Sequence, residues 1–309
     1  MRSKLFVPGT RPELFAKALA GEADAISLDL EDAVSEPRKD EARETVRQFL
    51  ESGDAASSRK TLIVRVNAMD TPHFERDIAA VARTGVQLIN LPKPQSPAHV
   101  RAATEAIERA EQANGVQAPI GLLLNIETPA ALRIAAELAL AHPRVAGLQL
   151  GLGDLFEPLG IARREPSAIR QAMFAVRIAA GEAGLYAYDS AFADIRDAEG
   201  FRSEAKLARD LGFLGKTCIH PSQIAIAMGV RSLGAHRKFY GDVLGFAEQP
   251  WPDGAAFRLG DSLVLLEEDR AATVDPVRQA RGWRYITLQV TDIDAVHDEL
   301  RSKGVREGL

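Results

Sequence analysis

Three carboxylates follow one short apolar run near the start of the sequence. The run at residues 25–28 leads directly into Asp29, Glu31 and Asp32. Carboxylates this close repel one another unless a cation, an arginine or water shares their surroundings. Alone, the stretch is equally consistent with a metal site and with a solvated acidic turn that caps the next helix. Its interpretation therefore depends on the partners that the rest of the chain supplies.

Two further carboxylates, Glu127 and Asp154, are the best candidates for metal ligands. Each follows an apolar run, at residues 122–126 and 148–150. Oxygen ligands favour a hard cation such as Mg²⁺, which keeps several waters and takes one or two protein carboxylates. No cluster of His and Cys has the spacing of a zinc site. The alternative is two unrelated carboxylates that accept hydrogen bonds from backbone amides.

Two basic residues also lie at the ends of apolar runs. Arg65, in the run at residues 62–66, needs an anion. That anion is either a carboxylate of the acidic stretch or a substrate carboxylate, which an arginine can clamp bidentately. Lys93 lies between two prolines, which predicts an extended segment. Its amine either offsets the acidic residues or is simply solvated.

Eight apolar runs alternate with helical patterns as far as about residue 226. The expected strands are residues 5–7, 25–28, 62–66, 87–91, 120–126, 145–150, 185–188 and 213–219. This count favours an α/β fold of the (β/α)₈ TIM-barrel type. A doubly wound open sheet is the alternative, but the connection after the first strand lacks the G-x-G-x-x-G form. In a barrel the carboxyl ends of the strands meet at one face, where the residues above would come together.

Composition and charge exclude several functional classes. The 309 residues carry a formal net charge of -5, which argues against non-specific binding of nucleic acid. No apolar run approaches the roughly 20 residues of a membrane span. The single cysteine, Cys218, cannot form an intrachain disulfide, and we expect a buried core residue in a cytoplasmic protein.

A series of motifs then points to a known family. The motifs are residues 2–12 (RSKLFVPGTRP), 29–34 (DLEDAV), 64–67 (VRVN), 91–93 (LPK), 126–128 (IET), 151–154 (GLGD) and 215–221 (GKTCIHP). In this order they resemble the citrate lyase β-subunit-like proteins and malyl-CoA lyases of the HpcH/HpaI aldolase superfamily. The resemblance covers residues 2 to about 226.

The resemblance implies an oligomeric TIM barrel, often a trimer, that cleaves carbon–carbon bonds reversibly by aldol or Claisen-type chemistry. It implies Mg²⁺ held by Glu127 and Asp154, and a keto-acid or 2-hydroxy-acid carboxylate bound by Arg65. The acidic stretch would lie beside the metal and orient its waters and Arg65.

The resemblance also implies a coenzyme A thioester as substrate. The residues that match the family's CoA-binding positions are Phe6, Arg11 and Lys17. We therefore expect a small acyl-CoA or keto-acid substrate, and a homo-oligomer as the assembly.

After about residue 226 the chain changes character. A helical pattern at residues 235–246 precedes expected strands at 255–259 and 262–266, with Gly260 and Asp261 between them. This block resembles the first βαβββ module of the glyoxalase/dioxygenase (vicinal oxygen chelate) superfamily, and residues 283–300 resemble the start of a second. We expect two domains, a TIM barrel over residues 1–226 and an incomplete α+β module over residues 227–309.

The changed C-terminus leaves three functions open. The leading one is a Mg²⁺-dependent carbon–carbon lyase. The family's C-terminal lid, which carries a catalytic aspartate, has no clear match, so the alternative is a subunit that binds CoA or a keto acid without turnover. An oxygen- or glyoxal-handling enzyme is disfavoured, because residues 225–231 and 283–289 contain no histidine to hold its metal.

Overall fold

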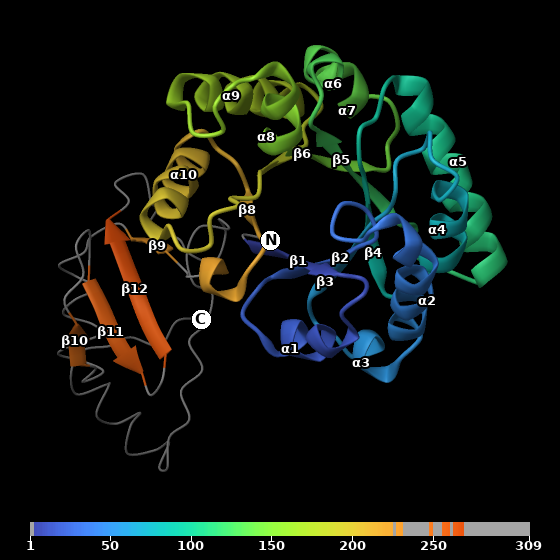
Figure 1. Ribbon diagram of the computed structural model, residues 1–309, viewed down its shortest axis with the longest axis horizontal. Coiled ribbons are helices and arrows are strands. Elements are labelled where there is room, and N and C mark those ends of the chain that lie inside the picture. Colours follow the sequence, from blue (N-terminus) through green and yellow to red (C-terminus); the bar gives the residue numbers. More distant parts are fainter. Residues whose placement is uncertain (1–2, 225–226, 231–246, 250–254, 260–261, 269–309) are drawn as a thin grey trace, which may run out of the picture. The chain divides into compact units, whose positions relative to one another are not determined.

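Eight parallel strands, β1 to β8, close into a barrel in which each strand pairs with the next and β8 pairs with β1 (Figure 1). The computed structural model describes residues 3–224, 227–230, 247–249, 255–259 and 262–268. The chain divides into two units, Met1–Ile224 and Ala225–Leu309, and the barrel forms the first. The predicted TIM barrel is confirmed. The alternative of an open sheet is wrong, because the sheet has no free edge.

All eight predicted strands are present within a few residues of their expected bounds. The strands are β1 (Ser3–Pro8), β2 (Ala25–Asp29), β3 (Thr61–Arg65), β4 (Val86–Leu91), β5 (Gly121–Ile126), β6 (Val145–Leu150), β7 (Tyr186–Asp189) and β8 (Gly215–Cys218). The helices are α1 (Phe15–Ala20), α2 (Lys39–Leu50), α3 (Gly53–Ala56), α4 (Phe74–Val81), α5 (Pro97–Asn114), α6 (Pro129–Arg133), α7 (Ala135–Ala139), α8 (Leu152–Phe156), α9 (Pro166–Glu182) and α10 (Ala198–Asp210). The short helices α3 and α8 were not expected from the sequence.

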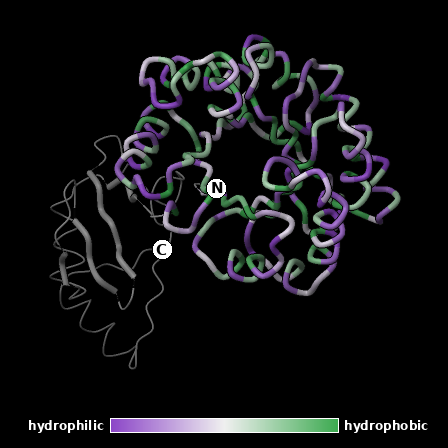
Figure 2. Tube along the Cα trace, viewed as in Figure 1, coloured by the Kyte–Doolittle hydropathy of each residue, from purple (hydrophilic) through white to green (hydrophobic). Residues whose placement is uncertain are grey.

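Side chains alternate between two environments along the barrel strands. Leu28, Val64 and Leu124 belong to the hydrophobic core, which contains residues of both strands and helices. Ser27 and Asn125 occupy alternate positions on the same strands, so they face the barrel interior, and both are fully buried. Figure 2 shows hydrophobic residues gathered along the strands, whereas the helices alternate between hydrophobic and hydrophilic residues. The strands therefore present apolar side chains to the surrounding helices and partly polar side chains to the barrel interior.

Capping residues place the helices that follow the site strands. Thr128 accepts a hydrogen bond from the amide of Ala131, and Pro129 occupies the first turn of α6. Glu165 and Pro166 play the same parts at the start of α9. These two helix starts fix the path of the chain after β5 and after α8.

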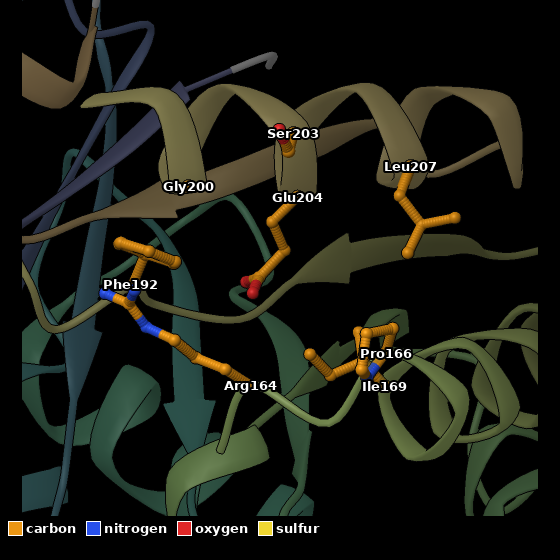
Figure 3. A pocket seen from close by; sticks show the side chains of 8 residues that line it. All are labelled: Arg164, Pro166, Ile169, Phe192, Gly200, Ser203, Glu204 and Leu207. Carbon is orange, nitrogen blue, oxygen red and sulfur yellow. The ribbon is translucent and has the colours of Figure 1, made fainter. Parts of the chain in front are cut away.

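A buried charge cluster joins α10 to β7 and β8. Lys216 Nζ lies 2.6 Å from Asp189 Oδ2 and 2.7 Å from Glu204 Oε1, and Arg163 donates to both Glu204 oxygens at 2.9 Å. Figure 3 shows Glu204 extending from α10 toward a cavity of about 220 Å³ bordered by Phe192 and residues of α9. The two cations and two carboxylates balance, as a buried cluster requires.

The described strands of the second unit form one four-stranded sheet. The strands are β9 (Ala227–Val230), β10 (Ala247–Gln249), β11 (Ala255–Leu259) and β12 (Ser262–Glu268). Their order is β10-β11-β12-β9, with antiparallel neighbours except for the parallel pair β12 and β9. This is the strand pairing expected of a βαβββ module, in which the first strand lies beside the last. The expected helix at 235–246, the turn at 260–261 and the second module lie outside the described residues.

Within the described part of the chain, no helix is both long and apolar enough to cross a membrane.

We predict that Lys216→Met destabilises the protein by about 3 kcal/mol, because it leaves Asp189 and Glu204 buried with one cation fewer. Urea unfolding at neutral pH measures the change. The exposed ion pairs of Arg47 with Glu44 and Glu51 provide the control. Arg47→Met should leave the unfolding midpoint nearly unchanged, and an equal shift in both variants would contradict the prediction.

Candidate active site

Arg65 brings the three carboxylates of the acidic stretch together at the mouth of the barrel. Asp29 and Arg65 end neighbouring strands in register. Arg65 donates to both oxygens of Asp29, from Nε at 2.7 Å and from Nη2 at 2.6 Å. Its Nη1 lies 2.9 Å from Glu31 Oε2 and 3.0 Å from Asp32 Oδ2. The structure therefore shows the first of the two arrangements open to Arg65, a pairing with the acidic stretch.

This pairing controls the protonation of the buried carboxylates. Burial would raise the pKa of Asp29, but the charge and hydrogen bonds of Arg65, with the amides of Glu31 and Ala33, hold it below its ordinary value. Burial dominates at Glu31, where the pKa stays raised although Arg65 and Lys93 oppose it. Asp29 is thus held as an anion, whereas burial disfavours the charged form of Glu31.

Glu127 follows β5 and is only 4% exposed. Its Oε1 accepts from the Lys93 amide at 3.1 Å, and its Oε2 accepts from Asn125 Nδ2 at 3.2 Å. Burial raises the pKa of Glu127 to about 7, and the nearby charges of Glu31 and Asp154 add to the effect. A cation placed beside Glu127 would stabilise the charged form of this carboxylate.

Gly151 leaves room for the Glu127 carboxylate. A Cβ added to Gly151 would lie 2.5 Å from Glu127 Cβ and 2.7 Å from Glu127 Oε2. Both distances are far below van der Waals contact. Glycine at this position is therefore a steric condition for the observed position of Glu127.

Lys93 lies among the carboxylates, and its backbone is not extended as the flanking prolines predicted. Its φ of +47° places it in the left-handed region, which is uncommon for a residue with a side chain. The turn directs Nζ to within 2.9 Å of Glu31 Oε1 and 3.1 Å of Asp154 Oδ2, while the amide is free to bind Glu127. Burial would lower the pKa of Lys93, but Glu31 and the other carboxylates raise it, so the amine stays charged.

Asp154 lies in the first turn of α8, directly after β6, rather than in a loop. Its side chain is 41% exposed and pairs with Lys93. The structure therefore brings Asp154, Glu127, Arg65 and the acidic stretch to one face of the barrel, as their positions at strand ends predicted.

The donor set fits a divalent cation. Five carboxylates, those of the acidic stretch with Glu127 and Asp154, share the mouth with two cations, Arg65 and Lys93, which pair with all of them except Glu127 in the described structure. The buried Oε2 of Glu31 has the Arg65 guanidinium 2.9 Å away as its ion-pair partner. Among the described residues, no group of three or more His, Cys, Asp or Glu side chains is placed to hold a metal ion. Mg²⁺ suits such a site, because it needs only one or two carboxylates and keeps its waters.

The three residues that match CoA-binding positions lie in two places. Phe6 faces the barrel interior, with its ring centre 4.6 Å from the Arg65 guanidinium carbon. Arg11 and Lys17 are exposed on the connection after β1 and on α1, and Arg11 pairs with Glu13. Phe6 thus lies beside Arg65, whereas Arg11 and Lys17 follow it on the exposed connection and on α1.

The sequence did not identify the polar residues beneath these groups. Lys4, Asn90, Asn125 and Gln149 face the barrel interior and are at most 4% exposed. Asn125 and Gln149 are the only strongly polar residues of their strands, whereas Asn90 shares β4 with Gln87 and Lys4 follows Ser3 in β1. That pattern was the available signal, but strand periodicity alone does not show that the four side chains meet.

The cavity between α9 and α10 belongs to a different part of the barrel. Its lining residues, Arg164 and Phe192 among them, include none of the candidate site residues. Arg164 instead pairs with Asp194 and Asp197. Cys218, as predicted, is buried.

Comparisons with known proteins identify a family for each of the two parts of the chain. Residues 2–221 match the sequence model of the HpcH/HpaI aldolase/citrate lyase family, and residues 223–308 match that of the Glyoxalase/Bleomycin resistance protein/Dioxygenase superfamily. Both predicted resemblances are confirmed.

Individual relatives cover most of the barrel. The (3S)-malyl-CoA thioesterase of Cereibacter sphaeroides is 37% identical over 75% of this chain and 77% of its own. Citrate lyase subunit beta of Leuconostoc mesenteroides is 36% identical over 72% of this chain and 74% of its own. The crystal structure of CitE from Mycobacterium tuberculosis with magnesium, acetoacetate and coenzyme A is 32% identical, with a TM-score of 0.62 over 85% of this chain and 92% of that one.

We predict that Glu127→Gln stabilises the metal-free protein at alkaline pH. The folded pKa of about 7 lies above the ordinary 4.5, so the native state binds the proton more tightly and loses stability as pH rises through 7. Glutamine removes that loss, which is worth about 3 kcal/mol at pH 8. Urea unfolding in a chelator at several pH values should show a gain that shrinks toward pH 4.5. A gain independent of pH, or the same gain in the exposed control Glu137→Gln, would rule out this explanation.

We predict that Gly151→Ala weakens Mg²⁺ binding at least about 10-fold, because the new methyl group displaces Glu127. Gly153→Ala is the matched control, since a Cβ there meets nothing within 4 Å. Titration calorimetry with MgCl₂ measures both variants. Equal affinities for the two alanine variants would show that Gly151 is not a steric requirement.

Proposed function

The chain belongs to the HpcH/HpaI aldolase/citrate lyase family, and we propose that it is a Mg²⁺-dependent carbon–carbon lyase. Its substrate would be a small acyl-CoA thioester of the malyl, citramalyl or citryl type, or a 2-keto or 2-hydroxy acid. The observation that carries the proposal is the meeting of Glu127 and Asp154 with Arg65 inside one acidic mouth.

The residues of this chain divide the work between metal and substrate. Glu127 and Asp154 would hold Mg²⁺, and the acidic stretch would orient its waters. When bound, the ion supplies Lewis-acid stabilisation of negative charge on carbonyl and carboxylate oxygens. Arg65 is held rigidly by Asp29, so its remaining N–H on Nη2 can bind a substrate carboxylate without reorganisation.

The cleavage itself requires a proton transfer as well as charge stabilisation. In a malyl-type thioester the hydroxyl loses its proton, and the electron pair of the breaking carbon–carbon bond moves to the carbon beside the thioester carbonyl. That carbon then takes up a proton, which gives an aldehyde or keto acid and a shortened acyl-CoA. Phe6 would contact the acyl end through the face it shares with Arg65, and the exposed Arg11 and Lys17 would meet the CoA phosphates.

A specific observation also favours binding without turnover as a second candidate. The match to the lyase family ends at residue 221, and the match to a different superfamily begins at residue 223. The region that carries the family's lid is therefore of another type in this chain. A subunit of this kind would bind CoA or a keto acid and leave it unchanged.

The assembly and the compartment stay predictions. The family resemblance favours a homo-oligomer, specifically a trimer, and the single cysteine favours the cytoplasm.

We predict that the protein cleaves at least one member of a panel of malyl-, citramalyl- and citryl-CoA, oxaloacetate and related keto acids, and only with Mg²⁺ present. Glu127→Gln and Asp154→Asn should each lower kcat/KM at least about 100-fold, because each removes a charged metal ligand. Coupled assays of the released acid measure turnover, with Glu137→Gln as the control. Ligand binding by calorimetry without any product would support the second candidate, and neither binding nor turnover would refute both.

A further inference from the structure

A chain of hydrogen bonds crosses the barrel interior from β1 to Glu127. Lys4 Nζ donates to Asn90 Oδ1 at 3.5 Å, Asn90 Nδ2 donates to Asn125 Oδ1 at 2.7 Å, and Asn125 Nδ2 donates to Glu127 Oε2 at 3.2 Å. Lys4, Asn90 and Asn125 are at most 1% exposed. Three strands, β1, β4 and β5, thus contribute to one contact with Glu127.

The chain has a fixed direction. Lys4 Nζ donates to the Asn90 oxygen, which therefore points toward the lysine. The Asn90 nitrogen also donates to the Leu123 carbonyl at 3.0 Å, and a carbonyl only accepts. Asn90 therefore presents N–H to Asn125, and Asn125 in turn presents N–H to the carboxylate. Reversal of either amide would place an oxygen against an oxygen.

The amine of Lys4 is buried, and removing a charged amine from water costs free energy. Its side chain contacts the amide oxygens of Asn90 and Gln149 and the face of Phe6, with Nζ 4.3 Å from the ring centre. Asp29 and Glu127 act on it only at longer range, and burial lowers its pKa well below the ordinary value. A lysine in this position contributes little to stability. Its amine does, however, orient the amides above it.

We propose that Asn125 and Asn90, with Lys4 at the origin of the chain, are positioning residues that hold Glu127 in the orientation that binds the metal. The inference rests on the proposed function, since it concerns the same carboxylate. Asn125 fixes Oε2 from inside the barrel, and the Lys93 amide fixes Oε1 from the mouth. Outer partners of a metal-binding carboxylate typically change affinity or activity 10- to 100-fold when they are removed.

Asn90→Asp is the sharpest test, because the two effects of the change oppose each other. The new carboxylate only accepts, so Asn125 must turn its nitrogen toward residue 90 and its oxygen toward Glu127. The added negative charge by itself would strengthen cation binding. We expect Mg²⁺ affinity in calorimetry to fall about 10-fold, and kcat to fall with it while KM for the organic substrate changes less than about 2-fold. Because the added negative charge alone would raise Mg²⁺ affinity, a lower affinity indicates that the Asn125 amide has reversed.

Two further variants keep the test independent of one substitution. Asn125→Leu removes the donor to Glu127 and should weaken Mg²⁺ binding similarly. Lys4→Met removes the origin of the chain with little change in volume. It should lower Mg²⁺ affinity while the melting temperature holds or rises, whereas a purely structural lysine would show the opposite pattern. Thr104→Val is the matched control, because it removes a buried hydrogen bond to Val100 in α5, away from the site.

The outcomes separate this inference from the proposed function. If the unaltered protein neither binds Mg²⁺ nor turns over any substrate, the proposed function is wrong and the inference falls with it. If the unaltered protein binds Mg²⁺ but the folded variants bind it within about 2-fold of the same affinity, the positioning role is overturned and the function stands. Weaker binding in the three variants and not in Thr104→Val supports the inference.

Discussion

The buried bidentate pair between Arg65 and Asp29 is the contact on which the rest of the site depends. Asp29 is 1% exposed and Arg65 is 9% exposed, so neither charge could remain there without the other. The register of β2 and β3 sets the two groups side by side. The amides of Glu31 and Ala33 also bind the Asp29 oxygens, at 3.0 and 3.1 Å, and so fold the acidic stretch around the pair.

From this pair a sequence of alternating charges runs across the barrel mouth. Arg65 contacts Glu31, Glu31 contacts Lys93, and Lys93 contacts Asp154. Glu127 stands beside this sequence without an ion pair of its own in the described structure, and it is the carboxylate with the most strongly raised pKa among them. The network therefore neutralises most of the mouth and leaves one buried carboxylate in need of a cation. The buried charge of Glu127 therefore lowers the stability of the folded state, a trade-off that is common at active sites.

The sequence predicted the barrel and the side of the barrel that carries the site, but not the contacts within it. Eight apolar runs separated by helical patterns are a local signal, and strand ends of a parallel barrel necessarily share a face. Glu127 and Asp154 could be placed for that reason. The left-handed turn at Lys93 could not be, because the prolines on either side suggest extended backbone and only the surrounding carboxylates favour the turn. The steric role of Gly151 and the meeting of Asn90 with Asn125 likewise depend on strand register, which shifts at Leu122 and Leu123 in β5.

The end of the barrel bears on what the second unit can contribute. After β8, Gln223 accepts from the Ile219 amide at 2.9 Å and donates to the Phe192 carbonyl at 2.8 Å, so the last turn of the first unit is tied to the loop after β7. All the residues that contact Arg65, Lys93 and Glu127 in the described structure precede this turn. Among the described residues, the candidate metal site is therefore built from residues 3–224. The contacts that hold the candidate metal ligands Glu127 and Asp154 in this structure are thus formed within the barrel unit.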